Sequence, residues 1–299
     1  MTNACKCENG SDLLNVLSFD VEDWGDLAPR LFALTPEPGA DLVVRQCEAI
    51  LRILAEANVH ATFFVLGRTA AYCPGLVARL VAAGHEIATH GYEHVPLTRL
   101  TTAQFAEDLR RAIGELTDVV GAPILGHRAP AFSVPPDRCE EFFDVLAEFG
   151  VLYDSSVVPM KCPRYGISGF SLAPTEVIAS NGQRIMEFPL SLVRWAGRFW
   201  PVAGGGFWRL LPKGVLQRAV HRLHRDHRPL ISYLHNCQFD PDFLKIRSAP
   251  GWRPKLRFWT FQQNLGHKSI PEKMILLLQR YRFGTFRELL SQYETYERE

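Results

Sequence analysis

The sequence contains no apolar run that approaches the roughly 18 consecutive residues of a membrane-spanning helix. It begins MTNACKCENGSD, which lacks the basic start and the apolar stretch of a signal peptide. We therefore expect a cytoplasmic protein without a transmembrane segment. A peripheral contact at the inner membrane surface is the alternative, and the basic, aromatic stretch Trp252 to Phe261 is the candidate for it, unless that stretch is simply a solvated loop.

The sequence also lacks an excess of charge of either sign, because its 299 residues include 33 Lys and Arg and 32 Asp and Glu. A net charge of +1 produces no broad electrostatic field, so we expect no nucleic-acid partner. The seven cysteines are odd in number and scattered, which argues against a disulfide framework. Hydrophobic residues make up 47% of the chain, enough for a sizeable core.

From residue 14 onward, apolar runs alternate with segments of helical periodicity, whereas residues 1–13 are expected to form a disordered tail. This alternation predicts an α/β fold with a parallel sheet covered by helices, formed by one domain over residues 14–299. Residues 155–210 are rich in Gly, Pro and aromatic residues and are expected to be irregular loops. The predicted strands are 14–19, 61–66, 86–89, 124–126, 151–153 and 230–235, and the predicted helices are 41–57, 73–83, 101–119, 137–149, 215–225 and 271–281.

Two histidines stand four residues apart in Thr89-His-Gly-Tyr-Glu-His94, directly after a predicted strand. If the strand continues into a turn of helix, the rings of His90 and His94 face the same way. Imidazole is a good ligand for zinc, and cobalt and nickel are alternatives. A coincidental pair of histidines is the competing interpretation, and the spacing alone does not decide between the two.

Three carboxylates cluster in Phe19-Asp-Val-Glu-Asp-Trp24, at the end of the first predicted strand. Acids also favour the N-terminus of a helix, which is the structural alternative. Three acids in four residues repel one another unless a cation lies near them. One carboxylate is therefore a candidate third metal ligand, and a second is a candidate general base.

Two further segments carry polar residues at the ends of predicted strands. In Gly126-His-Arg-Ala-Pro-Ala-Phe132, Arg128 is a candidate to orient a carboxylate, and Pro130 stiffens the turn. In Ser232-Tyr-Leu-His-Asn236, His235 is a candidate general acid toward a departing amine. Taken alone, each segment also fits a surface arginine or a core histidine. The carboxyl ends of barrel strands share one rim, so the four segments together predict metal-assisted hydrolysis.

These segments resemble the motifs of the polysaccharide deacetylase family, carbohydrate esterase family 4, which includes NodB-type chitooligosaccharide deacetylases. FDVED resembles the first motif, HGYEH the metal motif, HRAPAF the Arg-x-Pro motif and YLHN the late Leu-His motif. The resemblance covers residues 14–290 and implies a distorted (β/α)7-type barrel, the NodB homology domain, with extended loops. FDVEDW, GGGF followed by RLLP, and FGTFRELL also resemble the branch associated with exopolysaccharide export and exosortase (PEP-CTERM) clusters, which implies a role in exopolysaccharide biosynthesis.

The resemblance implies roles for the residues that match the family motifs. Asp20 would be the catalytic base, Arg128 would orient it, and His235 would be the acid. His90 and His94, with one carboxylate, would bind a divalent metal ion, with zinc favoured over cobalt and nickel. The implied substrate-binding residues are Tyr92, Pro130, Phe132 and Leu234, of which Leu234 would line the acetyl pocket, and core packing is the alternative for each aromatic ring.

The chain departs from the family pattern at two of these motifs. The usual Asp-Asp pair is here Asp20-Val-Glu22-Asp23. Alternation places Glu22 on the face of Asp20 if the strand continues, whereas an immediate turn favours Asp23, and both stay candidates for the metal carboxylate. After His235, the branch often has Pro-Trp-Glu, and this chain has Asn236-Cys-Gln, which bears on substrate choice.

The resemblance predicts a polysaccharide N-deacetylase. Its substrate would be an N-acetylhexosamine-containing polysaccharide, oligosaccharide or lipid-linked intermediate. Two other functions are compatible with the same fold. One is a different amide or ureide hydrolase of the allantoinase type, and the other is a catalytically inactive, carbohydrate-binding homologue. The intact histidine pair and Arg128 favour the deacetylase over both.

Overall fold

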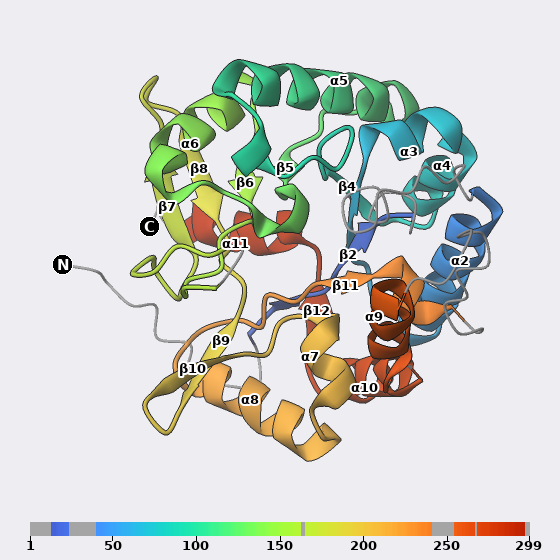
Figure 1. Cartoon of the computed structure of the whole chain (residues 1–299). Coiled ribbons are helices and arrows are strands. Elements are labelled where there is room, and N and C mark those ends of the chain that lie inside the picture. Colours follow the sequence, from blue (N-terminus) through green and yellow to red (C-terminus); the bar gives the residue numbers. More distant parts are fainter. Residues whose placement is uncertain (1–12, 24–39, 163–164, 241–253, 267, 297–299) are drawn as a thin grey trace.

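The structure is a computed structural model that describes residues 13–23, 40–162, 165–240, 254–266 and 268–296. Its centre is a curled eight-stranded sheet in the order β11-β2-β3-β4-β5-β6-β8-β7 (Figure 1). Neighbouring strands are parallel except that β7 pairs antiparallel with β8. The strands are β2 (Ser18–Val21), β3 (Thr62–Val65), β4 (Glu86–Thr89), β5 (Gly126–His127), β6 (Tyr153–Asp154), β7 (Thr175–Ile178), β8 (Arg184–Glu187) and β11 (Leu234–His235).

Two smaller pairings accompany this sheet. β1 (Asn15–Val16) pairs in parallel with β12 (Phe283–Gly284), so the beginning and the end of the fold lie side by side. β9 (Leu192–Trp195) and β10 (Arg198–Pro201) form an antiparallel hairpin. The first pairing thus links the last strand of the described chain to the first, whereas the hairpin pairs only two consecutive strands.

Helices surround the curled sheet (Figure 1). The long helices pack apolar residues at helical spacing toward the sheet, as in α2, where Val43, Cys47, Ile50 and Leu54 are buried. The α-helices are α2 (Ala40–Ala57), α3 (Gly67–Tyr72), α4 (Pro74–Ala82), α5 (Thr102–Val120), α6 (Cys139–Glu148), α7 (Gly205–Leu210), α8 (Lys213–Arg225), α9 (Pro254–Asn264), α10 (Ser269–Leu278) and α11 (Phe286–Tyr296). Short 3-10 helices are η1 (Leu97–Arg99), η2 (Pro130–Phe132), η3 (Pro136–Arg138) and η4 (Asn236–Phe239).

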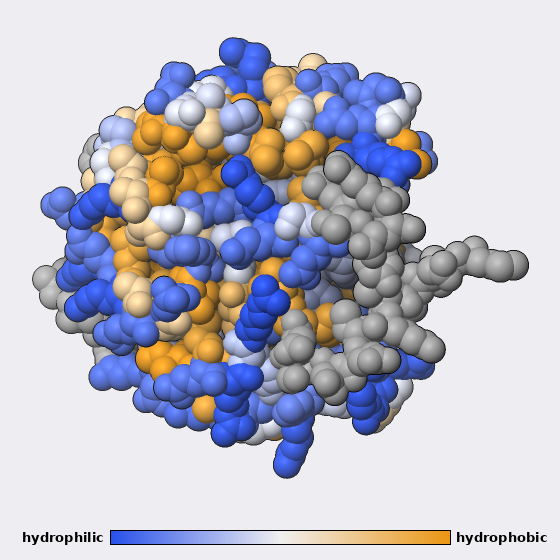
Figure 2. Space-filling view, turned by 180° about the vertical axis from the view of Figure 1, so that it is seen from behind, coloured by the Kyte–Doolittle hydropathy of each residue, from blue (hydrophilic) through white to orange (hydrophobic). Residues whose placement is uncertain are grey.

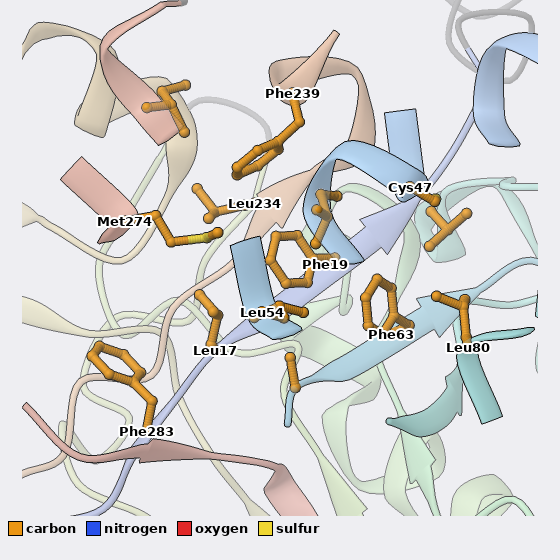
Figure 3. Close-up of a cluster of buried hydrophobic side chains, with 14 of the residues drawn as sticks. Leu17, Phe19, Cys47, Leu54, Phe63, Leu80, Leu234, Phe239, Met274 and Phe283 are labelled. Atoms are coloured by element: carbon orange, nitrogen blue, oxygen red, sulfur yellow. The ribbon is translucent and has the colours of Figure 1, made fainter. Parts of the chain in front are cut away.

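Alternation along the strands divides the buried side chains between two faces of the sheet. Leu17, Phe19 and Val21 pack with the outer helices in one cluster, where Figure 3 shows Phe19 near Leu234 and Met274. Val16 and Phe64 belong to a second cluster on the opposite face. Ser18 and Asp20 therefore lie on the face that carries this second cluster.

The surface of the protein carries both hydrophobic and hydrophilic residues. Seen from behind, hydrophobic side chains form patches that bands of hydrophilic side chains separate (Figure 2). None of the helices in the described part of the chain is both long and apolar enough to span a bilayer.

The predicted α/β architecture of distorted-barrel type is confirmed, with the sheet curled into a half-barrel. The expectation of irregular loops over residues 155–210 holds for residues 155–162 and 165–174, which contain no helix or strand. It is wrong for residues 175–210, which contain four strands, β7 to β10, and α7. The predicted disordered tail falls almost wholly on residues 1–12, which lie outside the described residues. Of the stretch Trp252 to Phe261, residues 254–261 lie in helix α9 and not in a loop, and the first two lie outside the described residues.

The core cluster around Phe63 provides a test of the packing. Phe63 is fully buried and stacks on Phe19 with ring centroids 5.1 Å apart. We expect Phe63→Ala to lower the free energy of unfolding by about 3 to 5 kcal/mol, because it leaves a cavity. Ile178→Ala on β7, where the side chain is 65% exposed, should change it by less than about 0.5 kcal/mol. Urea unfolding followed by circular dichroism measures both, and equal effects would contradict the packing described.

Candidate functional site

Polar residues gather at the carboxyl ends of adjacent parallel strands. Asp20 belongs to β2, His90 follows β4, Arg128 follows β5, and His235 ends β11. Because β11 pairs with β2 in a register that places His235 opposite Asp20, residues 215 positions apart become neighbours. The rim that the sequence predicts is thus formed by strands of one sheet.

Glu22, His90 and His94 converge on one point. The Oε1 atom of Glu22 lies 3.0 Å from Nε2 of His90 and 2.8 Å from Nε2 of His94. All three side chains are at least 95% buried. One possible ligand atom from each residue lies within 4.8 Å of the others, which is the arrangement of a metal site with three protein ligands.

The two histidines approach each other through a loop and not through a turn of helix. His90 and His94 are joined by a segment in which Gly91 has φ +78° and His94 has φ +55°. The carboxylate of Asp108 on α5 accepts hydrogen bonds from the backbone N–H groups of Tyr92 and Glu93 and so holds the segment in place. The predicted helical turn is therefore wrong, although both rings do point toward Glu22.

The hydrogen bonds of His90 test whether these residues suit a metal ion. Its Nδ1 lies 2.8 Å from the backbone carbonyl oxygen of Arg128, which can only accept, so Nδ1 carries the proton. Nε2 of the neutral ring then presents its lone pair to the Glu22 carboxylate, which requires a cation or a second proton between them. Metal-binding histidines in proteins commonly donate their other N–H to a carbonyl in this way.

The remaining buried atoms of the group point to the same chemistry. Nδ1 of His94 and Oε2 of Glu22 are buried without a hydrogen-bond partner, and Nε2 of His94 makes no hydrogen bond although it lies 2.8 Å from Oε1 of Glu22. Such atoms are costly unless another group satisfies them. Burial opposes the charge on Glu22, yet the neighbouring His94 and His90 hold the pKa of Glu22 well below its ordinary value. Burial likewise opposes the charge on His90, but the carboxylates of Asp20 and Glu22 raise its pKa. The donor set of two imidazoles and one carboxylate therefore fits a divalent ion.

Of the two carboxylates considered from the sequence, the structure brings Glu22 to the histidines. Within the described residues, the three-ligand groups contain Glu22, and Asp23 belongs to neither of them. The backbone N–H of Glu22 donates to Oδ1 of Asn236 at 2.9 Å, and Nδ2 of Asn236 donates to Gln46 at 2.7 Å. Asn236, noted above only as a departure from the branch pattern, thus fixes the backbone of Glu22.

A buried ion pair joins Asp20 to Arg128. Nη1 of Arg128 donates to Oδ1 of Asp20 at 2.7 Å and to Oγ of Ser18 at 2.8 Å. Nε donates to the backbone oxygen of Ser155 at 3.0 Å, and Nη2 donates to its Oγ, also at 3.0 Å. The guanidinium group lies over the ring of Phe64 at 4.0 Å. Sequence reasoning missed Ser18 and Ser155, although Ser18 could have been found because it shares a strand face with Asp20.

His235 lies on the open side of Asp20. Its Nε2 is 4.0 Å from Oδ2 of Asp20, and its side chain is 25% exposed. Asp20, Glu22 and His235 form a second group of converging ligand-type atoms that shares Glu22 with the first. The imidazole is thus accessible from solvent while the carboxylates beneath it are buried.

The predicted substrate-binding residues fall into different environments. Pro130 lies beside Gly91 of the histidine loop, and Phe132 meets the ring of Tyr233 edge-on with centroids 4.6 Å apart. Tyr92 packs its ring under the guanidinium group of Arg111 at 3.8 Å and against α3. Pro130 and Phe132 therefore lie near the site, whereas the contacts of Tyr92 are with helices α3 and α5.

Leu234 is not brought to the site with His235. It is fully buried in the cluster that contains Phe19, on the opposite face of β11 (Figure 3). Tyr233 shares the face of His235 by alternation, and their ring centroids are 5.7 Å apart. Sequence reasoning missed Tyr233, for which the two-residue spacing to His235 was the available signal.

Comparison with known proteins divides the chain into two matched segments. Residues 25–151 match the family model for polysaccharide deacetylase, and residues 155–291 match a model described as a domain of unknown function. A peptidoglycan-N-acetylglucosamine deacetylase from Listeria monocytogenes is 33% identical over 112 residues, which cover 38% of this chain and 24% of that protein. A chitooligosaccharide deacetylase from Bradyrhizobium is 40% identical over 63 residues, which cover 21% of this chain and 29% of that protein. The chain thus spans about a quarter of the length of these relatives.

These comparisons support the polysaccharide deacetylase family. The fold agrees with it, since a crystal structure described as a polysaccharide deacetylase from Mycobacterium smegmatis superimposes with a TM-score of 0.67 at 21% identity, covering 98% of this chain and 94% of that one. A CE4 family pseudoenzyme from Bacillus anthracis has a TM-score of 0.50 at 15% identity, covering 94% and 66%. At these identities, the likeness concerns the fold alone.

The geometry predicts different effects for the two neighbouring acids. We expect Glu22→Gln to weaken zinc binding by more than about 100-fold, because loss of a direct ligand should exceed the cost of losing an outer hydrogen-bond partner. Asp23→Asn should weaken it by less than about tenfold. Isothermal titration calorimetry on chelator-treated protein measures both affinities. A larger loss in Asp23→Asn would show that the other acid is the ligand.

Proposed function

We propose that the protein is a metal-dependent hydrolase that removes N-acetyl groups from an N-acetylhexosamine-containing polysaccharide, oligosaccharide or lipid-linked glycan. The observation that carries the proposal is Asp20, held by Arg128, facing His235 beside the group Glu22, His90 and His94. The names of the Listeria and Bradyrhizobium relatives, both deacetylases of N-acetylated glycans, support it.

The metal site of this proposal consists of Glu22, His90 and His94. Two imidazoles and one carboxylate suit zinc, and cobalt or nickel would suit the same set. When bound, such an ion supplies a Lewis acid that polarises the acetamide carbonyl. The protein fixes the orientation of the proposed metal ligands, since the carbonyl of Arg128 orients the His90 ring and Asn236 holds the backbone of Glu22.

Asp20 takes the role of general base. Arg128 engages Oδ1, which leaves Oδ2 on the side of His235, where an attacking water would lie. Because Arg128 is itself fixed by Ser18 and Ser155, the carboxylate cannot rotate away without breaking a buried network. A positioned base of this kind contributes about 10² to 10⁴ in rate.

His235 takes the role of general acid. Cleavage of the C–N bond leaves an amine, which must gain a proton as the acetyl group departs. The partial exposure of His235 lets its imidazole exchange protons with solvent between turnovers, whereas Asp20 is buried. The backbone N–H of His235 donates to Gln238 at 3.0 Å, which holds the residue at the strand end.

The acetyl and sugar groups would rest on apolar side chains beside these residues. Phe132 and Tyr233 form an edge-on aromatic pair next to His235, and Pro130 lies beside the histidine loop. These residues are proposed to bind the acetyl methyl group and one sugar face. Among the predicted substrate-binding aromatic residues, Tyr92 is less well supported than Phe132, because its ring packs against Arg111. A role in exopolysaccharide biosynthesis in the cytoplasm, at the inner membrane surface, stays a prediction.

Acetate release from N-acetylglucosamine oligomers tests the metal requirement. We expect wild-type protein to lose activity after chelation and to regain it with zinc or cobalt, because the ion polarises the scissile carbonyl. His90→Ala should stay inactive under both conditions, whereas Ile178→Ser, on the exposed edge strand, should behave like wild type. Wild-type protein that binds zinc tightly but releases no acetate from any acetylated glycan would favour the inactive, carbohydrate-binding alternative.

Variants of Asp20 and His235 test the proposed proton transfers separately from metal binding. We expect Asp20→Asn and His235→Gln each to lower kcat by about 10² to 10⁴, because each removes one proton transfer. Zinc affinity, measured by calorimetry, should change by less than about tenfold in both variants because neither residue is a ligand in the proposed set. Loss of zinc binding in Asp20→Asn would contradict the division of roles.

A further inference from the structure

One segment of the chain contains basic residues but no acidic ones. Residues 188–225 contain no Asp or Glu, although acids and bases are nearly balanced over the whole chain. The same segment forms the β9–β10 hairpin, α7 and α8. It contains seven basic residues, namely Arg194, Arg198, Arg209, Lys213, Arg218, Arg222 and Arg225.

The β9–β10 hairpin carries exposed aromatic rings among these charges. Phe199 is 39% exposed and lies opposite Arg194 in the pairing register. Trp200 is 50% exposed and, by alternation, shares the other face of the hairpin with Arg198. A tight turn at positive φ joins the strands and lies at the lower edge of the molecule (Figure 1). One face of the hairpin thus presents Phe199 with Arg194, and the other presents Trp200 with Arg198, beside the partly buried Trp195.

Helix α7 begins four residues after the hairpin and carries two further exposed apolar side chains. Its Phe207 and Leu210 are 38% and 66% exposed. Trp208 of the same helix is fully buried and donates from Nε1 to the carbonyl of Val202 at 2.7 Å, which fixes α7 to the end of the hairpin. We call the exposed side chains Arg194, Arg198, Phe199, Trp200, Phe207 and Leu210 the hairpin–α7 surface.

We infer that the hairpin–α7 surface binds the anionic surface of a lipid bilayer. Aromatic rings favour the headgroup level of a membrane, and arginines attract anionic lipids. An exposed aliphatic side chain such as Leu210 gains by entering the acyl boundary but gains nothing from an anionic glycan. No acid within residues 188–225 repels anionic headgroups. Two acids from outside this segment, Glu272 and Asp226, are paired with its Lys213 and Arg222.

A small cleft lies between this surface and the candidate active site. Its volume is about 20 Å³, and it is lined by Pro201 and Phe207 from the hairpin–α7 side and by Phe132 and Tyr233 from the site. If the proposed deacetylase function holds, membrane binding brings the residues around His235 close to a glycan carried on a lipid. The membrane contact itself does not depend on that function.

Sedimentation with lipid vesicles tests the contact directly. We expect wild-type protein to bind vesicles of phosphatidylcholine with phosphatidylglycerol, and to bind phosphatidylcholine alone far more weakly. Arg194→Gln with Arg198→Gln should lower partition onto anionic vesicles about 30-fold, from about 1 kcal/mol for each basic residue at such a surface. Phe199→Ser with Trp200→Ser should lower it by about tenfold or more. Added salt should weaken wild-type binding.

Matched variants separate this surface from general effects. Arg52→Gln with Arg110→Gln removes the same charge from α2 and α5. Ile178→Ser removes from β7 an apolar side chain that is more exposed than Phe199 and Trp200. Both controls should bind vesicles as wild type does. All variants should keep the wild-type circular dichroism spectrum and, if the proposed function holds, acetate release from soluble oligomers.

Three outcomes would overturn the inference. They are no binding of wild-type protein to anionic vesicles, equal losses in the test and control variants, and arginine-dependent binding to a soluble anionic polysaccharide without binding to vesicles. The last result would identify a polyanion site instead. Because acetate release is measured separately on soluble oligomers, failure of membrane binding and failure of the deacetylase proposal are distinguishable.

Discussion

The candidate site depends on one buried cation. The guanidinium group of Arg128 is fully buried, and such a charge is costly unless it is paired and hydrogen-bonded. Asp20 and Ser18 from β2 and Ser155 after β6 satisfy it, and Phe64 from β3 lies beneath it. The same residue offers its backbone carbonyl to His90. Asp20, the proposed base, and His90, a proposed metal ligand, are therefore both held by Arg128, whereas Asn236 holds the backbone of Glu22.

This network crosses the boundary between the two matched segments. Arg128, His90 and His94 lie in the segment that matches polysaccharide deacetylase, whereas Ser155, Tyr233 and His235 lie in the segment described as a domain of unknown function. Strands β3 to β5 of the first segment and β7, β8 and β11 of the second belong to one sheet. They are joined through β6 and β2, which lie outside both matched segments. The second segment thus completes the half-barrel and supplies one side of the site. We propose that residues 14–299 form a single domain, as the sequence suggests.

Sequence reasoning found the parts of the site that have a local signal. Strands rich in apolar residues and ending in acids or histidines were visible, because alternation and periodicity act over a few residues. The choice of Glu22 over Asp23 depended on the exact residue at which β2 ends, which no local pattern fixes. The loop through Gly91 depends on Asp108, a residue of a distant helix. The position of Leu234, on the face opposite His235, could not be predicted because a motif names residue types but not the face of a two-residue strand.

The pairing of β11 with β2 has a consequence for how the protein is made. Asp20 and His235 are opposite each other in the sheet but are separated by 215 positions along the chain. At about 5 to 20 residues per second, a ribosome needs roughly 10 to 40 seconds to extend the chain from one to the other. During that interval, β2 has no neighbour on one side, and the acids stand at an unprotected sheet edge. The growing chain therefore exposes this unpaired strand edge until residues 234 and 235 have been made, and an exposed edge of this kind is prone to aggregation.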